Sequence, residues 1–188
     1  MTMRPGVRKF ALTAHVTSSV GWLGAVAGSM VIAVAAVTSR DPQIVRGAYL
    51  TLELTGWYVL VPFAFASLLT GLVESLGTTW GLFRHYWVLF TLLMNLFATV
   101  VLLLYMQTLS YLAGLAADTT ASGAALSVLK SPSAVIHSGG AMLLLLVAVT
   151  LSVYKPRGMT GYGQRKQRDR GAPTRSARSQ PQPALSQL

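Results

Sequence analysis

The chain has 188 residues, of which 53% are hydrophobic and 11% charged, whereas a typical soluble domain is about 25% charged. Fifteen Lys and Arg against five Asp and Glu give a formal net charge of +10. Cysteine is absent, which excludes disulfides, thiolate metal sites and cysteine nucleophiles. The charges are unevenly spread, and this distribution excludes an ordinary soluble globular domain. Four runs contain none of them: residues 10–39, 54–73, 86–117 and 131–154.

These uncharged runs predict an all-α integral membrane four-helix bundle over residues 1–157. Each run reaches the roughly 20 residues that a helix needs to cross a bilayer core. Helices are expected because lipid offers the backbone no hydrogen-bond partner and four segments cannot close a barrel. Pro62 is expected to kink the second helix without ending it. The predicted crossings lie at about residues 11–37, 54–73, 86–112 and 134–154.

The distribution of Lys and Arg predicts that both termini are cytoplasmic. Three of these residues lie before the first crossing, Arg84 lies in the middle loop, and eight follow the last crossing. The loops on the other side hold only Arg40, Arg46 and Lys130. Positive charge is normally retained on the cytoplasmic side of a membrane.

An alternative for the first apolar run is a cleavable signal peptide. Arg8 and Lys9 precede the run, and Ala25-Val26-Ala27 resembles a cleavage site. The run continues well past that site, which favours a spanning helix.

Residues 158–188 predict a disordered basic tail, because they are rich in Arg, Gln, Ser, Pro and Gly and hold few large apolar side chains. The cations that begin with Arg165 lie close to the predicted membrane surface, where anionic lipid headgroups would attract them. The simpler interpretation is an orientation anchor. Nucleic acid is not an expected partner, because no aromatic residue follows Tyr162 to stack on bases.

Small and polar residues form stripes on the predicted helices, as they do where membrane helices pack together. On the first helix, Gly24 and Gly28 form a small-xxx-small pair. His15, Trp22 and Ser29 lie on roughly the opposite side. Both faces of this helix are therefore expected to be occupied by packing partners.

Ionisable residues inside the apolar runs are candidate functional residues, because placing them in a membrane costs free energy. They fall into two sets by depth. A helix rise of 1.5 Å per residue separates His15 from His137 by roughly 15–20 Å along the membrane normal, so they cannot bind one iron atom together. The cytoplasmic set holds His15, Glu74, Arg84 and His85, and the opposite set holds Glu53 and His137.

Two kinds of interpretation fit these residues. In the structural one, residues at helix ends reach water, and each intramembrane histidine bonds to a hydroxyl or carbonyl of the next helix. In the functional one, His15, His85 or His137 binds haem b or copper. Proton handling by His15 and Glu74, beside Arg84, is a third alternative.

A metal site on the outer side is the sharpest version of the cofactor hypothesis. It would combine His137 with Glu53 and either Met106 or Met142, since imidazole and thioether groups suit copper or haem iron. No cofactor is assigned, and the chain contains no phosphate loop, His-Glu-x-x-His helix or nucleophile elbow. A catalytic role is therefore not expected.

Several stretches resemble known families. His15, followed by GWLG at 21–24, is similar to the first helix of the copper-resistance D group, a resemblance that implies metal handling at His15. LTGLVESLG (69–77), WGLFRHYWVL (80–89) and LSVYKPRG (151–158) resemble an actinobacterial family of four-helix predicted integral membrane proteins of unknown function. That resemblance covers about residues 8–167.

Together these observations predict a multi-pass protein of a bacterial cytoplasmic (inner) membrane. Its expected role is that of a non-catalytic accessory or packing subunit, working through helix–helix contacts within a homo-oligomer or a membrane complex. The first alternative is a redox protein that binds haem or a metal through its histidines. The second is a transporter of a small solute or of protons.

Overall fold

Long helices dominate the computed structural model, which describes residues 3–77, 82–118, 127–156 and 158–171. The second rod of the bundle consists of three elements, α2, η1 and α3, that follow one another without a break. The elements are α1 (Pro5–Thr38), α2 (Pro42–Thr55), the π-helical η1 (Gly56–Leu60), α3 (Val61–Gly77), α4 (Tyr86–Ala117), α6 (Ser133–Tyr154) and α7 (Gly161–Gly171).

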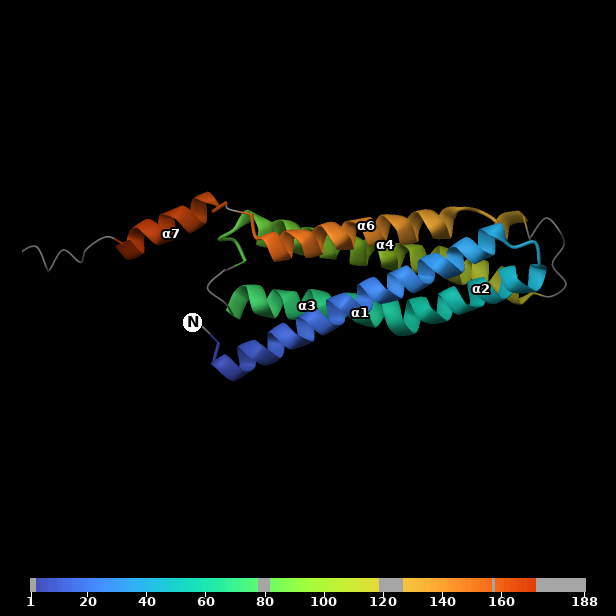
Figure 1. Cartoon of the computed structure of the whole chain (residues 1–188), viewed down its shortest axis with the longest axis horizontal. Coiled ribbons are helices and arrows are strands. Elements are labelled where there is room, and N and C mark those ends of the chain that lie inside the picture. The colour runs from blue at the N-terminus through green and yellow to red at the C-terminus, as the bar shows by residue number, and fades with distance from the viewer. Residues whose placement is uncertain (1–2, 78–81, 119–126, 157, 172–188) are drawn as a thin grey trace, which may run out of the picture.

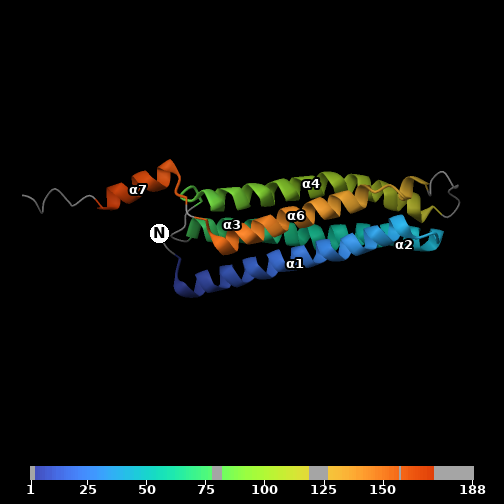
Figure 2. The same ribbon diagram turned by 45° about the horizontal axis from the view of Figure 1, so that its top comes forward.

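The four rods pack side by side in chain order (Figures 1 and 2). α1 contacts α2, α3 and α6, and α4 also contacts α2, α3 and α6. The last rod therefore closes the bundle against the first. We call the end where α1 begins and α3 finishes the near end, and the end where α1 finishes and α2 begins the far end.

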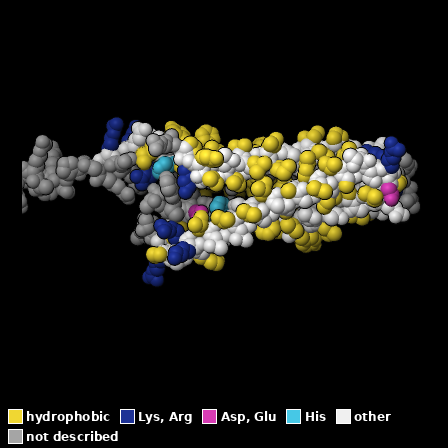
Figure 3. Space-filling view, in the orientation of Figure 1, with side chains coloured by type: hydrophobic (Ala, Val, Ile, Leu, Met, Phe, Trp, Pro, Cys, Tyr) yellow, Lys and Arg dark blue, Asp and Glu magenta, His cyan; other side chains and the backbone are white. Residues whose placement is uncertain are grey.

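All four rods are long and apolar enough to cross a membrane. Hydrophobic side chains cover the sides of the bundle on the face that Figure 3 shows, while Lys and Arg gather toward its ends, most of them at the near end. A soluble protein rarely exposes so much contiguous apolar surface. Length, composition and surface together indicate a multi-pass membrane protein, as the sequence predicts.

The second rod begins at Pro42, well before the predicted crossing at residue 54. Asp41 caps it, because its carboxylate accepts a 2.8 Å hydrogen bond from a backbone N–H of the first turn. Arg46 donates to the carbonyl oxygen of Ala116 at 3.3 Å, in the last turn of α4. The charged stretch is helical because the far end supplies partners for its polar groups.

Pro62 does not end the second rod, and the irregularity that accompanies it is the π-helical turn directly before it. The N–H of Val61 bonds to the carbonyl oxygen of Gly56, five residues back. Such turns accommodate the backbone groups that a proline frees. A Cβ atom on Gly56 would lie 2.5 Å from Sδ of Met106, so α4 approaches this turn closely.

The first part of the predicted disordered tail has regular structure. Thr160 accepts a 3.1 Å hydrogen bond from the N–H of Gly163, which makes it the N-cap of α7. Its own N–H donates to the carbonyl oxygen of Arg84 at 3.1 Å, and its hydroxyl donates to that of Phe83. The turn before α4 thus supplies the acceptors that fix the tail, and α7 projects away from the near end (Figure 1). Residues 172–188, the rest of that prediction, lie outside the described residues.

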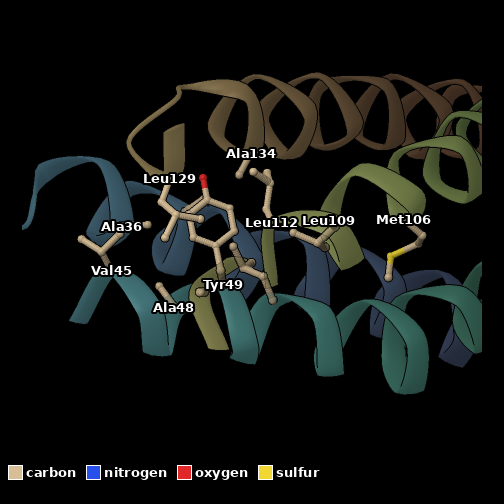
Figure 4. Packing of buried hydrophobic residues seen from close by; sticks show 12 residues of the cluster. Ala36, Val45, Ala48, Tyr49, Met106, Leu109, Leu112, Leu129 and Ala134 are labelled. Atoms are coloured by element: carbon tan, nitrogen blue, oxygen red, sulfur yellow. The ribbon is translucent and has the colours of Figure 1, made fainter. Parts of the chain in front are cut away.

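Two clusters of buried side chains fill the bundle, one toward the far end and one near its middle. Figure 4 shows Tyr49 of α2 in the midst of the first cluster, with Leu112, Leu129 and Ala134 around it. The Tyr49 side chain is fully buried, and its hydroxyl has no hydrogen-bond partner in the described part of the chain. The second cluster surrounds Trp22.

Candidate functional site

A polar seam joins α1 to α3 in the near half of the bundle; it consists of His15, Ser19, Ser67 and Thr70. Nδ1 of His15 lies 3.1 Å from the carbonyl oxygen of Ser67 and 3.1 Å from Oγ1 of Thr70. The two serine hydroxyls lie 2.8 Å apart. The Thr70 hydroxyl donates to the carbonyl oxygen of Ala66, so both partners of His15 accept. Nδ1 of His15 therefore carries a proton, and in the neutral imidazole Nε2 has the lone pair.

The His15 ring rests on Gly71 of α3. A Cβ atom at residue 71 would lie 2.9 Å from Cε1 of the ring, so the absence of a side chain there is what admits the imidazole. Glu74, one turn further along α3, interacts electrostatically with His15 and with Lys155. This geometry matches the structural interpretation of His15, a histidine bonded to a carbonyl and a hydroxyl of the next helix.

Arg84 and His85 lie at the near end, where they join the bundle to the tail. His85 is the N-cap residue of α4 and forms an isolated β-bridge with Met159. The N–H of Tyr86 donates to the carbonyl oxygen of Gly158 at 3.4 Å, within the same contact. The backbone of these two predicted site residues thus has an architectural role.

His137 lies in the far half of the bundle, on the second turn of α6. Its Nδ1 is 2.8 Å from the carbonyl oxygen of Ser133, one turn earlier in the same helix. Its ring stacks on Tyr105 of α4, with 3.8 Å between ring centroids and an angle of 15° between the planes. Because a carbonyl can only accept, Nδ1 carries a proton, and in the neutral imidazole Nε2 is then an acceptor.

The described residues contain no group of three or more His, Asp and Glu side chains that could hold a metal ion. A metal at His137 and Glu53 would therefore need a thioether ligand. Met106 is fully buried against Gly56, and Met142 is packed against the cluster around Trp22. The haem, copper and transport alternatives remain predictions.

A cavity of about 280 Å³ occupies the centre of the bundle between the two buried clusters. Its wall is mostly apolar and receives side chains from all four rods. Phe97 and Ile136 are 61% and 65% exposed, so the cavity opens sideways between α4 and α6. Its polar lining residues are Ser29, Tyr105, His137 and Ser138.

Ser29 distinguishes this cavity from ordinary packing space. Its side chain is 3% exposed, and its Oγ has no hydrogen-bond partner among the described residues. By contrast, the buried hydroxyl of Thr99 bonds back to its own helix, at 2.8 Å from the carbonyl oxygen of Asn95, whereas the Tyr105 hydroxyl in the cavity wall shares the condition of Ser29. The sequence places Ser29 on a packing face but carries no signal for a cavity there, because the cavity forms only where four rods meet.

Comparison with protein-family models, with curated proteins and with solved structures gives no match. The resemblances noted in the sequence therefore remain expectations.

Proposed function

We propose that this chain is a non-catalytic accessory subunit of a bacterial cytoplasmic membrane, with both termini cytoplasmic, and that it binds a partner through one face of α1. The observation that carries this proposal is an unoccupied row of small residues along that helix. The excess of Lys and Arg at the near end, where α1 begins, supports the orientation.

One face of α1 packs inside the bundle, against α2, α3 and α6. It includes the serines and the tryptophan that the sequence assigns to a packing face. Gly21 also packs inward, since a Cβ atom there would lie 2.9 Å from the ring of Phe63. The buried residues recur at helical spacing: Ala11, Ser18, Trp22, Val26, Ser29, Ala33 and Ala36.

The opposite face of α1 is exposed along most of its length. A Cβ atom on Gly24 or Gly28 would meet nothing within 4 Å, so no other part of the described chain uses this small-xxx-small pair. The prediction that both faces of α1 are occupied is therefore confirmed for one face, because no described part of the chain covers the other. The exposed residues also recur at helical spacing: Thr13, Thr17, Val20, Gly24, Gly28, Val31 and Ala35.

A row of this kind suits a second transmembrane helix. Lipid tails are as apolar as leucine, so apolar burial does not drive membrane helices together. Small residues instead allow two backbones to approach closely and gain van der Waals contact. The row extends over more than the roughly 20 residues that cross a bilayer core.

The proposal is tested by placing a photo-crosslinking amino acid at Val20 and illuminating native membranes. We expect an adduct whose mass identifies either a second copy or another membrane protein, and we expect Gly28→Leu to abolish it by keeping the backbones apart. The same crosslinker at Leu143, which is 67% exposed on α6, is the matched control. A monomer in mild detergent, with no adduct specific to Val20, would contradict the proposal.

A further inference from the structure

The central cavity has the size and the lining of a site for a small amphiphile. Its 280 Å³ is close to the lower end of the roughly 300–1,000 Å³ that ligand pockets span. The wall is predominantly apolar, which favours an apolar body over a cluster of water molecules. A head group and the first part of a hydrocarbon chain would fill such a space.

The mouth of the cavity faces the zone that lipid would occupy. On the α4 side the lining extends from Phe97, eleven residues and about 16 Å into the helix, to Tyr105, nineteen residues and about 28 Å into it, which is within the span of a 30 Å bilayer core. Across the mouth, Ile136 and Gly140 of α6 are both exposed. A ligand would therefore enter from the bilayer, and the rest of its apolar body could remain among the lipid chains.

The polar groups of the lining specify the chemistry of the head group. In a neutral His137, Nε2 can only accept a hydrogen bond, because the Nδ1 proton is committed to the carbonyl oxygen of Ser133. The hydroxyls of Ser29 and Tyr105 can donate or accept, and both are buried without a partner among the residues that the structure describes. A buried hydroxyl in that condition costs free energy that a ligand would recover. A donor in the head group would suit Nε2 of His137, and a hydroxyl, which both donates and accepts, would also suit Ser29 and Tyr105.

We propose that the cavity binds a lipid-soluble alcohol or phenol, which donates a hydrogen bond to His137 or Ser29 while its apolar body extends through the mouth between α4 and α6. Two sources share this chemistry: a chain alcohol derived from a lipid, and a molecule whose hydroxyl is on an aromatic ring. The site is separate from the exposed face of α1 and does not depend on an accessory role.

The cavity supplies its own reporter, because Trp22 lines it and is only 2% exposed. Replacing Trp57, Trp80 and Trp87 by Phe leaves this single tryptophan, and the protein is placed in phosphatidylcholine nanodiscs. The probe is 11,12-dibromododecan-1-ol, whose bromine atoms quench indole fluorescence on contact. We expect saturable quenching. The methyl ether of the same probe partitions similarly but cannot donate, and it should bind roughly 3- to 10-fold more weakly.

Three variants locate the binding. Gly140→Leu fills the mouth and should abolish saturable quenching; a Cβ atom there meets nothing within 4 Å, so the backbone need not move. Gly114→Leu, at an equally open glycine outside the lining, is the matched control and should have no effect. His137→Phe keeps a ring on Tyr105 but removes the acceptor, and Ser29→Ala removes the hydroxyl. One of these two variants should remove the preference for the alcohol over its ether.

The outcomes separate specific binding from simple partition. Quenching that rises linearly with probe, or that is unchanged by Gly140→Leu while Trp22 keeps its emission maximum, would overturn the proposal. A second probe, 2,4-dibromophenol, distinguishes the sources. If it saturates at a lower concentration than the chain alcohol, the site is built for a ring-borne hydroxyl; the reverse order indicates a chain alcohol.

Discussion

The two histidines inside the long apolar helices, His15 and His137, differ in where their ring nitrogens find hydrogen-bond partners. His15 is bonded to the adjacent helix and rests directly on Gly71, inside the polar seam. His137 bonds only within its own helix, stacks on Tyr105 and lines a cavity. One histidine uses its polarity to join two helices. The other retains an acceptor at the edge of an open space.

The difference shows that the role of a polar residue in an apolar helix follows from the groups it contacts, and that its presence alone does not reveal this role. A bonded histidine between helices contributes to packing, and its deletion should affect stability. His137 makes no hydrogen bond to another helix in the described structure, so a replacement that keeps the ring stacked on Tyr105 should affect binding more than stability. The following predictions test this division, starting with the largest effect.

Substituting the two glycines beside these sites should change stability in opposite directions. Gly71→Ala drives a methyl group into the His15 ring and should lower the free energy of unfolding by about 1–3 kcal/mol, the usual cost of overpacking. Gly140→Ala faces open space and should raise it by up to about 1 kcal/mol, because alanine favours the helix. Circular dichroism during unfolding in mixed detergent micelles measures both. Equal changes in the two variants would remove the distinction between the sites.

Removing the histidines should separate stability from binding. His15→Leu breaks both contacts with α3 and should cost about 1–2 kcal/mol of unfolding free energy. A double-mutant cycle of His15→Leu with Thr70→Val should give a coupling of about 0.6 kcal/mol, typical of an interhelical hydrogen bond in a membrane. His137→Phe should stay within about 0.5 kcal/mol of the native protein. A larger loss in His137→Phe than in His15→Leu would reverse our assignment.

Tyr49→Phe tests whether the buried hydroxyl of Tyr49, which has no partner in the described structure, lowers the free energy of unfolding. Removing that hydroxyl from a side chain that is fully buried should raise the free energy of unfolding by about 1 kcal/mol, since no hydrogen bond in the described structure is lost. The same unfolding assay measures the change. Thr99→Val is the contrasting control; its hydroxyl is bonded, so removing it should lower stability. A destabilised Tyr49→Phe protein would show that the hydroxyl has a partner in solution.

The smallest effect concerns the tail. Thr160→Val removes both the cap of α7 and the contact with Phe83, yet leaves the bundle intact. Unfolding of the bundle should change by less than about 0.5 kcal/mol, while amide hydrogen exchange at Gly163 should accelerate. Thr160→Ser keeps the hydroxyl and should retain the slow exchange. Unchanged exchange in Thr160→Val would mean that the hydroxyl does not fix the tail.

The sequence predicts the number of long helices and their approximate places, because uncharged runs of this length have few other solutions. It also anticipates how His15 is bonded. It does not predict that the second rod starts at Pro42: Asp41 is a local N-cap signal before Pro42, but the partner of Arg46 lies at the end of α4, which only the fold brings near. The helix after Thr160 was missed for a related reason, because its acceptors are carbonyl groups of a distant turn.

The candidate site was harder to predict than the fold. Helical spacing shows which face of its own helix Ser29 or His137 occupies. A cavity depends instead on how the side chains of four helices pack together, and spacing along one helix does not show this. The close approach of Gly56 to Met106 and the π-helical turn that contains Gly56 likewise have no signature in periodicity. A pairing of His137 with Glu53 was inferred from depth alone, and the described residues supply no complete ligand set for it.

The clasp between Thr160 and the turn at Phe83 has a consequence for how the protein is made. The acceptors of that turn are synthesised before the last two rods, and the threonine that engages them emerges only after those rods. The clasp can form only when an even number of crossings separates the two segments, so that both return to the same aqueous compartment. If one of the last two rods failed to insert, the tail and the turn would lie on opposite sides of the bilayer, and the hydrogen bonds between them could not form. Formation of the clasp therefore requires that the last two rods have both crossed the membrane.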